Sequence, residues 1–465
     1  MSNKASKDSR AQWASSLGFI LAAAGSAVGL GNIWKFPGKA YEGGGGVYIL
    51  TYILIVILIG ATAMMAELTV GRSTQKNAVG AFRILAPKWK WVGGLGVFTG
   101  FVILGYYSQV GGWVLQYIIS YLTKPGEIYG DPQGFFLNQV LGADRFPVLG
   151  AFVFPLLFIA CVVLVIVRGV EGGIERFNKV AMPALFLLLL VLLGRSLTLP
   201  GAGVGLRYLL TFDLSSLNGS VLLSALGQAF YSLSLGMGIM CTYGSYVKHT
   251  EDLGKNMAMI CSLDTLVALI AAFIIIPAVF ATGVQPGKGA SFAFVSLAGV
   301  FERMPLGSLF GVIFYTLLFF AALTSAISLL EGTVAYLTEE KGLGRTKATV
   351  LTAAGMFFIG VLYTLSQVHM EIRGIWLDGA SGLTFPAFGD FLEFFTDRLM
   401  TPLGALTYCI FVGWVWGPKK AVAEIEREGV RFPLAKPWAM LVKYVAPAAI
   451  VVILFAGMVM GLTLS

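Results

Sequence analysis

The residues from Gly25 to Pro37 combine chemical features that a membrane-spanning helix rarely contains. They read Gly-Ser-Ala-Val-Gly-Leu-Gly-Asn-Ile-Trp-Lys-Phe-Pro, inside an apolar run that begins near Ser16. Glycine costs a helix up to about 1 kcal/mol relative to alanine, and a backbone group freed from a helix finds no water in lipid. We therefore predict a broken membrane helix whose free carbonyls hold a cation and whose free N–H groups hold an anion.

The same glycines permit a second interpretation. Gly25 and Gly29 are four residues apart, which is the spacing that lets two membrane helices pack closely. Asn32 and Lys35, however, fall at membrane depth, where polar side chains are costly and usually functional. These two side chains favour a binding segment over a packing motif.

A second apolar run, from Gln228 to Tyr246, is interrupted in a similar way. Gly236 and Gly238 lie in its middle. Hydroxyl side chains flank these glycines at Ser232, Ser234 and Thr242. Corresponding interruptions in the two halves of a chain are typical of inverted-repeat transporters, whose binding sites lie near the bilayer midplane. We therefore expect the two interrupted segments to meet at one site.

The composition is that of a membrane protein. Of the 465 residues, 57% are hydrophobic and 12% are charged, whereas about 25% of the residues of a soluble domain are charged. The net charge of +8 is spread over short loops, so it does not indicate a nucleic-acid partner. His249 and His369 are isolated and the four cysteines lie in apolar runs, which argues against a metal centre or a catalytic triad built on histidine.

Apolar runs of about 20 residues predict eleven transmembrane helices. They lie at residues 16–37, 45–70, 92–123, 148–167, 174–199, 221–247, 256–284, 307–338, 347–367, 388–416 and 437–463. Lys and Arg gather in one set of alternate loops, such as residues 72–90 and 419–443. The expectation is an all-α, multi-pass protein of the cell (inner) membrane, with a cytoplasmic N-terminus and the C-terminus outside.

The Gly25–Pro37 segment resembles the first-helix signature of the neurotransmitter:sodium symporters, the family of the bacterial leucine transporter. The interrupted run at Gln228–Tyr246 and the Ala-x-Leu-Thr-Ser run at Ala321–Ser325 match in the same order, so the resemblance covers residues 10–450. It implies one transporter domain over residues 1–465 with a 5+5 inverted repeat and broken helices 1 and 6. Helices 1–5 would occupy residues 1–199, helices 6–10 residues 200–416, and helix 11 residues 437–463.

Two sodium sites follow from the resemblance. The first would use the Ala27 carbonyl, Asn32, Ser232 and Asp264, together with the carboxylate of the substrate. Asp264 stands where the leucine transporter has an amide, so it adds a full negative charge; a salt-bridged structural acid is the alternative reading. The second site would use the carbonyls of Gly25, Val28 and Ala321 with the hydroxyls of Thr324 and Ser325.

The resemblance also implies a substrate site between spans 1, 3, 6 and 8. The substrate carboxylate would meet N–H groups at Leu30 and Gly31 and the Tyr107 hydroxyl, and the amine would meet carbonyls near Ala27. The expected contact residues are Ser26, Ala27, Leu30, Gly31, Ile103, Tyr107, Tyr231, Ser232, Ser234, Met237, Ser325, Ala326 and Leu329. The pocket is mostly apolar and Met237 is adaptable, which favours neutral amino acids, hydrophobic before small.

Charged and aromatic residues match the gates of the family. Lys35 and Glu393 correspond to the outer pair. The inner gate corresponds to Arg10, Trp13, Tyr246 and Glu339. Two further acids in apolar runs, Glu67 and Glu331, are interpreted as hydrogen-bond acceptors that brace the broken helices.

Some members of the family need chloride, and Tyr52, Gln228 and Ser232 match that site. Where the leucine transporter places a compensating acid, this chain has Ala268. Asp264 supplies a negative charge nearby, so we expect chloride not to be required.

The leading functional hypothesis is a sodium-coupled symporter that imports a neutral amino acid by alternating access, with two Na⁺ ions. A small amino acid such as glycine or alanine as substrate, and a sensor that binds without flux, remain alternatives. A channel would need a ring-like filter, and no Gly-x-Ser-x-Gly or His-Glu-x-x-His motif supports an enzyme. The expected partners are the amino acid and the lipid bilayer, and the protein is expected to be a monomer or a weak homo-oligomer.

Overall fold

The computed structural model describes residues 11–144, 148–287, 289–369 and 388–459, and within them it contains helices and no β-strand. The first half is built from α1 (Ser16–Ala27), η1 (Gly31–Lys35), α2 (Phe36–Glu42), α3 (Gly46–Ile55), η2 (Val56–Gly60), α4 (Ala61–Thr74), α5 (Ala78–Leu85), η3 (Pro87–Trp89), α6 (Lys90–Thr123), α7 (Pro125–Gly130), α8 (Pro132–Gly134), η4 (Phe135–Val140), η5 (Val148–Val153), α9 (Phe154–Ile166), η6 (Val170–Glu175) and α10 (Arg176–Leu197). The second half contains α11 (Ala202–Leu210), η7 (Leu214–Ser216), α12 (Gly219–Ser232), α13 (Ile239–Gly244), α14 (Leu253–Thr282), η8 (Phe292–Ser296), α15 (Leu297–Glu302), α16 (Gly307–Lys341), α17 (Arg345–His369), α18 (Phe388–Glu393), η9 (Phe394–Met400), α19 (Thr401–Ile410), η10 (Phe411–Trp416), α20 (Pro418–Ile425), η11 (Arg427–Gly429), α21 (Ala435–Met440), η12 (Leu441–Val445) and α22 (Ala446–Val459).

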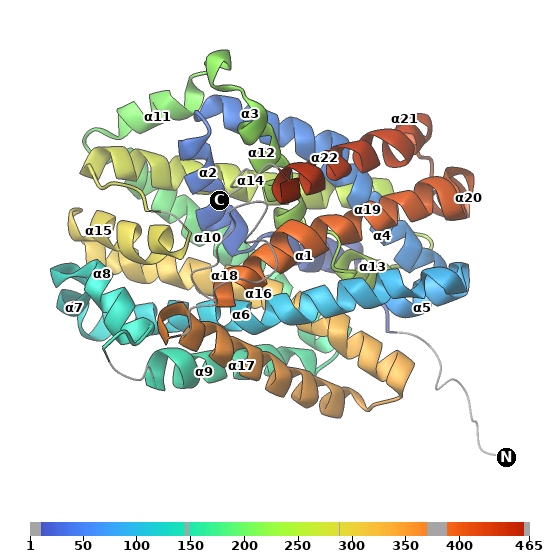
Figure 1. Ribbon diagram of the computed structural model, residues 1–465, viewed down its shortest axis with the longest axis horizontal. Helices are drawn as coiled ribbons and strands as arrows, with labels where there is room; N and C mark the ends of the chain where they lie inside the picture. The colour runs from blue at the N-terminus through green and yellow to red at the C-terminus, as the bar shows by residue number, and fades with distance from the viewer. Residues whose placement is uncertain (1–10, 145–147, 288, 370–387, 460–465) are drawn as a thin grey trace.

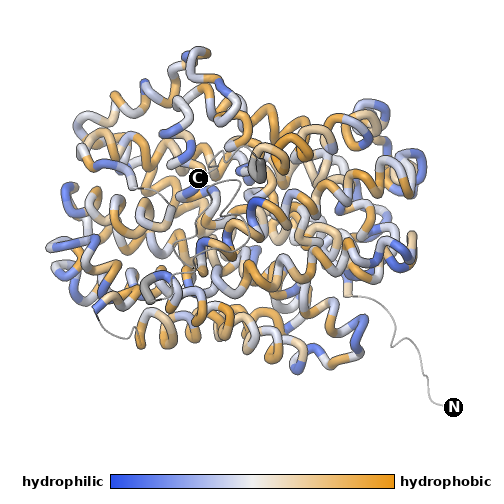
Figure 2. Tube along the Cα trace, in the orientation of Figure 1, coloured by the Kyte–Doolittle hydropathy of each residue, from blue (hydrophilic) through white to orange (hydrophobic). Residues whose placement is uncertain are grey.

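The long helices run mostly along one axis, which is horizontal in Figure 1. Polar residues gather at the two ends of this axis, whereas the middle is predominantly apolar (Figure 2). Large apolar side chains are exposed on outward faces, for example Leu50, Leu54 and Ile57 at the junction of α3 and η2. This distribution suits a helix bundle that faces hydrocarbon, since lipid-facing helices satisfy their backbone groups internally.

The α1–η1 segment lies at the centre of the bundle. It packs against α14 on one side and α16 on the other, and α10 also contacts α1. Helix α6 packs along α16, α17 and α9. The central position matters because a helix that is interrupted at membrane depth must be enclosed by protein.

Both predicted interruptions are present. Helix α1 ends at Ala27, and the pair formed by residues 16–27 and 31–42 is bent by 55° at the break. Between α12 and α13 the backbone takes positive φ angles at Ser234, Gly236 and Gly238 (54°, 79° and 68°). The carboxylate of Glu67 accepts a hydrogen bond from the Gly236 N–H at 2.6 Å, as expected for an acid that braces a broken helix.

Nine helices in the described part of the chain are long and apolar enough to cross a membrane, and the bent α1–α2 pair adds a tenth. The predicted count of eleven differs from this because the span expected at residues 221–247 is divided into α12 and a six-residue α13. Helix 11 was expected at residues 437–463, and the structure begins it at Ala435 and describes it to Val459. The eleven-span count and the division into repeats stay predictions.

Glycine is required at position 236, which gives a first testable prediction. A Cβ at Gly236 would overlap the Thr401 carbonyl oxygen and lie 2.8 Å from the Ala405 nitrogen, at a φ angle that side chains disfavour. Gly236→Ala should therefore lower the stability of the purified protein by about 2 kcal/mol or more, measured as thermal unfolding in detergent.

Gly227→Ala on α12 is the matched control, because no atom lies within 4 Å of the added carbon. Alanine there should be neutral or stabilising by up to about 1 kcal/mol. Equal unfolding midpoints for the two variants would contradict the backbone assigned to the second break.

Candidate functional site

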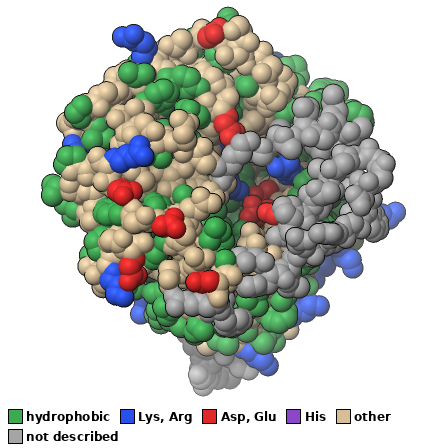
Figure 3. Space-filling view, turned by 60° about the vertical axis from the view of Figure 1, so that its left-hand side comes forward, with side chains coloured by type: hydrophobic (Ala, Val, Ile, Leu, Met, Phe, Trp, Pro, Cys, Tyr) green, Lys and Arg blue, Asp and Glu red, His purple; other side chains and the backbone are tan. Residues whose placement is uncertain are grey.

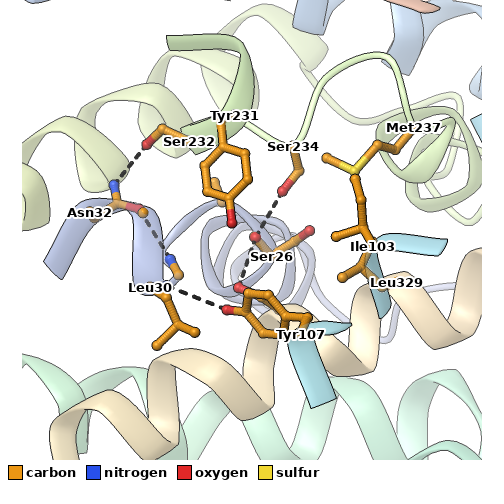
Figure 4. A pocket seen from close by; sticks show the side chains of 14 residues that line it. Ser26, Leu30, Asn32, Ile103, Tyr107, Tyr231, Ser232, Ser234, Met237 and Leu329 are labelled. Atoms are coloured by element: carbon orange, nitrogen blue, oxygen red, sulfur yellow. Dashed lines mark hydrogen bonds between the residues drawn. The ribbon is translucent and has the colours of Figure 1, made fainter. Parts of the chain in front are cut away.

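The two breaks face each other across a cavity of about 370 Å³ (Figure 4). Its walls come from the first break, α6, the end of α12 with the second break, and α16. The lining residues are Ser26, Ala27, Gly29, Leu30, Gly31, Asn32, Ile103, Tyr107, Tyr231, Ser232, Ser234, Met237, Ser325 and Leu329. The structure therefore brings together twelve of the thirteen predicted substrate contacts, and Ala326 is the exception.

Ala326 is fully buried but does not line the cavity. It follows Ser325 on α16, and successive residues of an α-helix point about 100° apart because the helix has 3.6 residues per turn. Ser325 and Leu329, four residues apart, share the face that lines the cavity. The expectation for Ala326 is corrected on this ground.

One end of the cavity is polar and the other is apolar (Figure 4). At the polar end, the Leu30 N–H points at the Tyr107 hydroxyl at 3.4 Å. The side chains of Ile103, Met237 and Leu329 lie together at the other end. No charged side chain lines the cavity. A small molecule with a polar head and an uncharged side chain fits this arrangement.

The proposed first sodium site is a tight cluster of polar groups in the described structure. Asn32, Ser232 and Asp264 are each at most 1% exposed. Asn32 Nδ2 donates to Asp264 Oδ1 at 2.7 Å and to Ser232 Oγ at 2.9 Å. Ser232 Oγ donates to both carboxylate oxygens, at 2.9 and 3.0 Å. Oxygen groups are thus concentrated where a hard cation would bind.

Asn32 faces this cluster with its amide nitrogen. Its Oδ1 accepts from the Gly29 N–H at 3.1 Å, within the first break. For the amide oxygen to contact a cation beside Asp264, the terminal amide must turn about its χ2 bond. The side chain therefore links the backbone of the break to the carboxylate of Asp264.

The residues of the expected chloride site surround Asp264 instead of a separate anion site. The Tyr52 hydroxyl donates to Asp264 Oδ2 at 3.2 Å, and Ser232 donates to the same carboxylate. Gln228 Nε2 donates to the Gly31 carbonyl at 3.0 Å. The donors that would hold an anion are thus directed at a carboxylate of the chain itself, while Ala268 is buried and apolar.

The ligands expected for the second sodium ion also converge. Ser325 Oγ lies 3.4 Å from the carbonyl oxygens of both Gly25 and Val28. Thr324 Oγ1 lies 3.1 Å from the Ala321 carbonyl oxygen. All these groups are buried. Carbonyls freed at the end of α1 therefore meet two hydroxyls of α16.

The outer ion pair differs from the prediction. Lys35 Nζ contacts Asp397 Oδ2 at 3.1 Å and lies over the Tyr231 ring. Glu393 accepts a hydrogen bond from the Tyr363 hydroxyl at 2.6 Å. The acids are four residues apart at the α18–η9 junction, so both lie near Lys35, but the register brings Asp397 into contact. Figure 3 brings this end forward, and basic and acidic side chains lie in a hollow there.

At the inner end, the structure places three of the four predicted gate residues, and Arg10 lies outside the described residues. Trp13 Nε1 donates to the Tyr243 carbonyl at 3.1 Å. The Tyr246 hydroxyl donates to Glu331 Oε1 at 2.7 Å. Glu339 Oε2 accepts from the Asn77 N–H at 3.0 Å.

Sequence reasoning missed Arg345 as part of this end. Its guanidinium forms a two-bond pair with the buried Glu331 carboxylate, at 2.5 and 3.2 Å, and donates to the Ile166 carbonyl at 2.8 Å. A buried acid in an apolar helix requires a partner, so Glu331 signalled that a cation had to be nearby. It did not indicate which of the basic residues after α16 would serve.

Comparisons with known proteins agree with this site. Residues 10–127 and 127–463 match the family model of the sodium:neurotransmitter symporters. The sodium-dependent transporter YhdH of Bacillus subtilis is 38% identical over 448 residues, 95% of this chain and 96% of YhdH. A sodium-dependent transporter of Haemophilus influenzae is 32% identical over 462 residues, 97% of this chain and 98% of that protein. The crystal structure of MhsT in complex with L-phenylalanine aligns with a TM-score of 0.85 and 39% identity, over 96% of this chain and 100% of that one.

The contact between Lys35 and Asp397 gives a second prediction. A double-mutant cycle with Lys35→Gln and Asp397→Asn should yield a coupling free energy of about 1 kcal/mol or more, because the two charges are in direct contact and partly buried. The measurement is the thermal stability of the four purified proteins. The cycle with Glu393→Gln is the matched control, and coupling that is larger there than at Asp397 would contradict the observed pairing.

Proposed function

The chain belongs to the sodium:neurotransmitter symporter family and is a sodium-dependent membrane transporter rather than an enzyme, and from this premise we propose that it imports a neutral amino acid with a hydrophobic side chain. One observation carries the proposal: the cavity between the breaks has backbone N–H groups and a tyrosine hydroxyl at one end and three apolar side chains at the other. The phenylalanine bound by MhsT supports the same substrate class.

The substrate carboxylate would bind the Leu30 and Gly31 N–H groups and the Tyr107 hydroxyl, since the amino-terminal end of a helix segment attracts anions. The amine would bind carbonyl oxygens near Ala27 and Ser234. The substrate side chain would lie against Ile103 and the other apolar residues. The absence of a charged side chain among the lining residues argues against a substrate with a charged side chain.

Two sodium ions would move inward with each substrate. The first would bind at Ala27, Asn32, Ser232 and Asp264, beside the substrate carboxylate. The second would bind the carbonyls and hydroxyls listed for α1 and α16. Two charges crossing a potential of about 100 mV release roughly 4.6 kcal/mol, at about 2.3 kcal/mol per charge. Binding of both ions to the broken helices would couple this energy to alternating access.

The proposed setting is the cell membrane, with the α5 and α20 end of the bundle in the cytoplasm. Trp13, near the N-terminus, belongs to that end, and the basic loops at residues 72–90 and 419–443 support the orientation. The outer pair at Lys35 would then face outward, and the Glu331–Arg345 pair would close the inner side. The protein would act as a monomer or a weak homo-oligomer.

A third prediction tests the substrate class by linkage. The purified protein should be stabilised by leucine-like or aromatic amino acids in Na⁺, and not in K⁺, because a ligand at 100 times its Kd adds about 2.7 kcal/mol to stability. The measurement is the unfolding temperature with each of the twenty amino acids in both salts. Stabilisation by glycine or alanine alone would replace the hydrophobic substrate with a small one.

Uptake by proteoliposomes with an imposed sodium gradient separates transport from sensing. A transporter should accumulate the stabilising amino acid many-fold, and the accumulation should collapse when a sodium ionophore is added. Binding without accumulation would contradict transport and favour a sensor.

A fourth prediction concerns chloride. Uptake by the wild-type protein should be unchanged when gluconate replaces chloride, because Asp264 already supplies a negative charge to the donors Tyr52 and Ser232. Asp264→Asn keeps an oxygen ligand but removes that charge, so uptake in gluconate should fall by about ten-fold or more. Chloride should restore part of it. A chloride requirement in the wild-type protein would contradict this role of Asp264.

A further inference from the structure

An amide side chain from α10 reaches the first break from a direction that the sodium-site assignments above do not include. Asn178 is 1% exposed and lies on α10, which packs along α1 and α16. Its Nδ2 donates to the Ile174 carbonyl, one turn earlier, at 2.9 Å. Its Oδ1 is buried and has no hydrogen-bond partner in the described structure.

A buried amide oxygen without a partner calls for an explanation. Leaving such a group unsatisfied costs about 1–3 kcal/mol, and an unmodelled ion or water is among the usual reasons for it. The hydrogen bond to Ile174 fixes the orientation of the amide, since only the NH₂ group can donate to a carbonyl. The oxygen therefore points away from α10.

The oxygen points at the residues proposed to hold the second sodium ion. A Cβ built on Gly25 would overlap Asn178 Oδ1 and lie 3.2 Å from the Thr324 Cβ. The amide oxygen thus lies between the end of α1 and the hydroxyl-bearing turn of α16. Glycine at position 25 leaves the room that this approach needs, in addition to its effect on the helix.

We propose that Asn178 Oδ1 is a ligand of the second sodium site, and this inference rests on the sodium coupling proposed above. Carbonyl-type oxygens are the ligands that hard cations prefer, and broken helices of transporters supply them for Na⁺. The site then draws on three elements: the Gly25 and Val28 carbonyls of the first break, the α16 groups, and the Asn178 amide of α10. Because the amide is neutral, it adds an oxygen without adding a charge.

The position also ties α10 to the ion. The η6–α10 junction begins two residues after Gly169, which has a φ of +86°, and Ile174 lies within the π-helical turn η6. The Asn178 amide is anchored to that turn through Ile174. Binding of the ion would therefore hold the start of α10 against the end of α1, and release of the ion would free both.

The experiment measures sodium affinity directly. The full-length protein is purified and its unfolding temperature is titrated with NaCl at constant ionic strength, with choline as the replacement cation and no amino acid present. Asn178→Leu has a similar volume without the oxygen, and its half-saturating Na⁺ concentration should rise by about ten-fold. Asn178→Asp keeps the oxygen, so its half-saturating concentration should stay at or below that of the wild-type protein.

Two further variants calibrate the result. Thr324→Val removes a hydroxyl from the same site and should raise the half-saturating concentration to a similar degree. Asn256→Leu removes another buried amide, on α14, whose Oδ1 accepts from Ser16 Oγ at 3.2 Å. This matched control should leave the sodium titration unchanged. If Asn178→Leu does not fold, Asn178→Val carries the same test.

The outcomes separate this inference from the proposed function. If Asn178→Leu lowers stability equally in Na⁺ and in choline, with an unchanged half-saturating concentration, Asn178 has a structural role only and the inference is overturned. If the wild-type protein itself shows no sodium-dependent stabilisation, the proposed sodium coupling fails, and this inference fails with it.

Discussion

The whole arrangement depends on one constraint: backbone groups that leave a helix inside hydrocarbon must find partners within the protein. At the second break, the Gly236 N–H is held by the Glu67 carboxylate. At the first break, the Gly25 and Val28 carbonyls face the Ser325 hydroxyl. The partners available there are small hydroxyls and amides rather than complementary backbone. The enclosed polar groups therefore form the walls of a cavity suited to an ion and a small polar ligand.

Electrostatics separates the two ion sites that these walls imply. Asp264 is surrounded by neutral donors, Asn32, Ser232 and Tyr52, and no Lys or Arg among the described residues forms an ion pair with it. A buried carboxylate in such surroundings strongly attracts a cation, because desolvation without a counter-charge is costly. The site at the end of α1 consists of neutral oxygens only. Its affinity must come from the number and geometry of those oxygens, which is why one additional amide oxygen matters there.

The sequence predicted the breaks well because glycine spacing and polar residues within apolar runs have direct structural consequences. It located twelve of the residues that line the cavity through the family resemblance, while Ala326 was misplaced because helical phase at the end of a run cannot be read without packing. Two acids four residues apart, Glu393 and Asp397, made the partner of Lys35 ambiguous, and the π-helical turn η9 shifts the register in favour of Asp397. Asn178 carries no local signal at all, since only the packing of α10 against α1 gives its amide a role.

The energies involved fit a cycle in which ions loosen and tighten the centre of the bundle. Each hydrogen bond between the breaks and their neighbours contributes about 0.5–1.5 kcal/mol net. Two sodium ions driven by about 100 mV supply roughly 4.6 kcal/mol, which is comparable to rearranging a handful of such bonds. A continuous central helix would have to break many more bonds to open. Interrupting the helices at Gly25–Gly31 and Ser234–Gly238 therefore lowers the cost of moving their halves to a level that the ion gradient can supply.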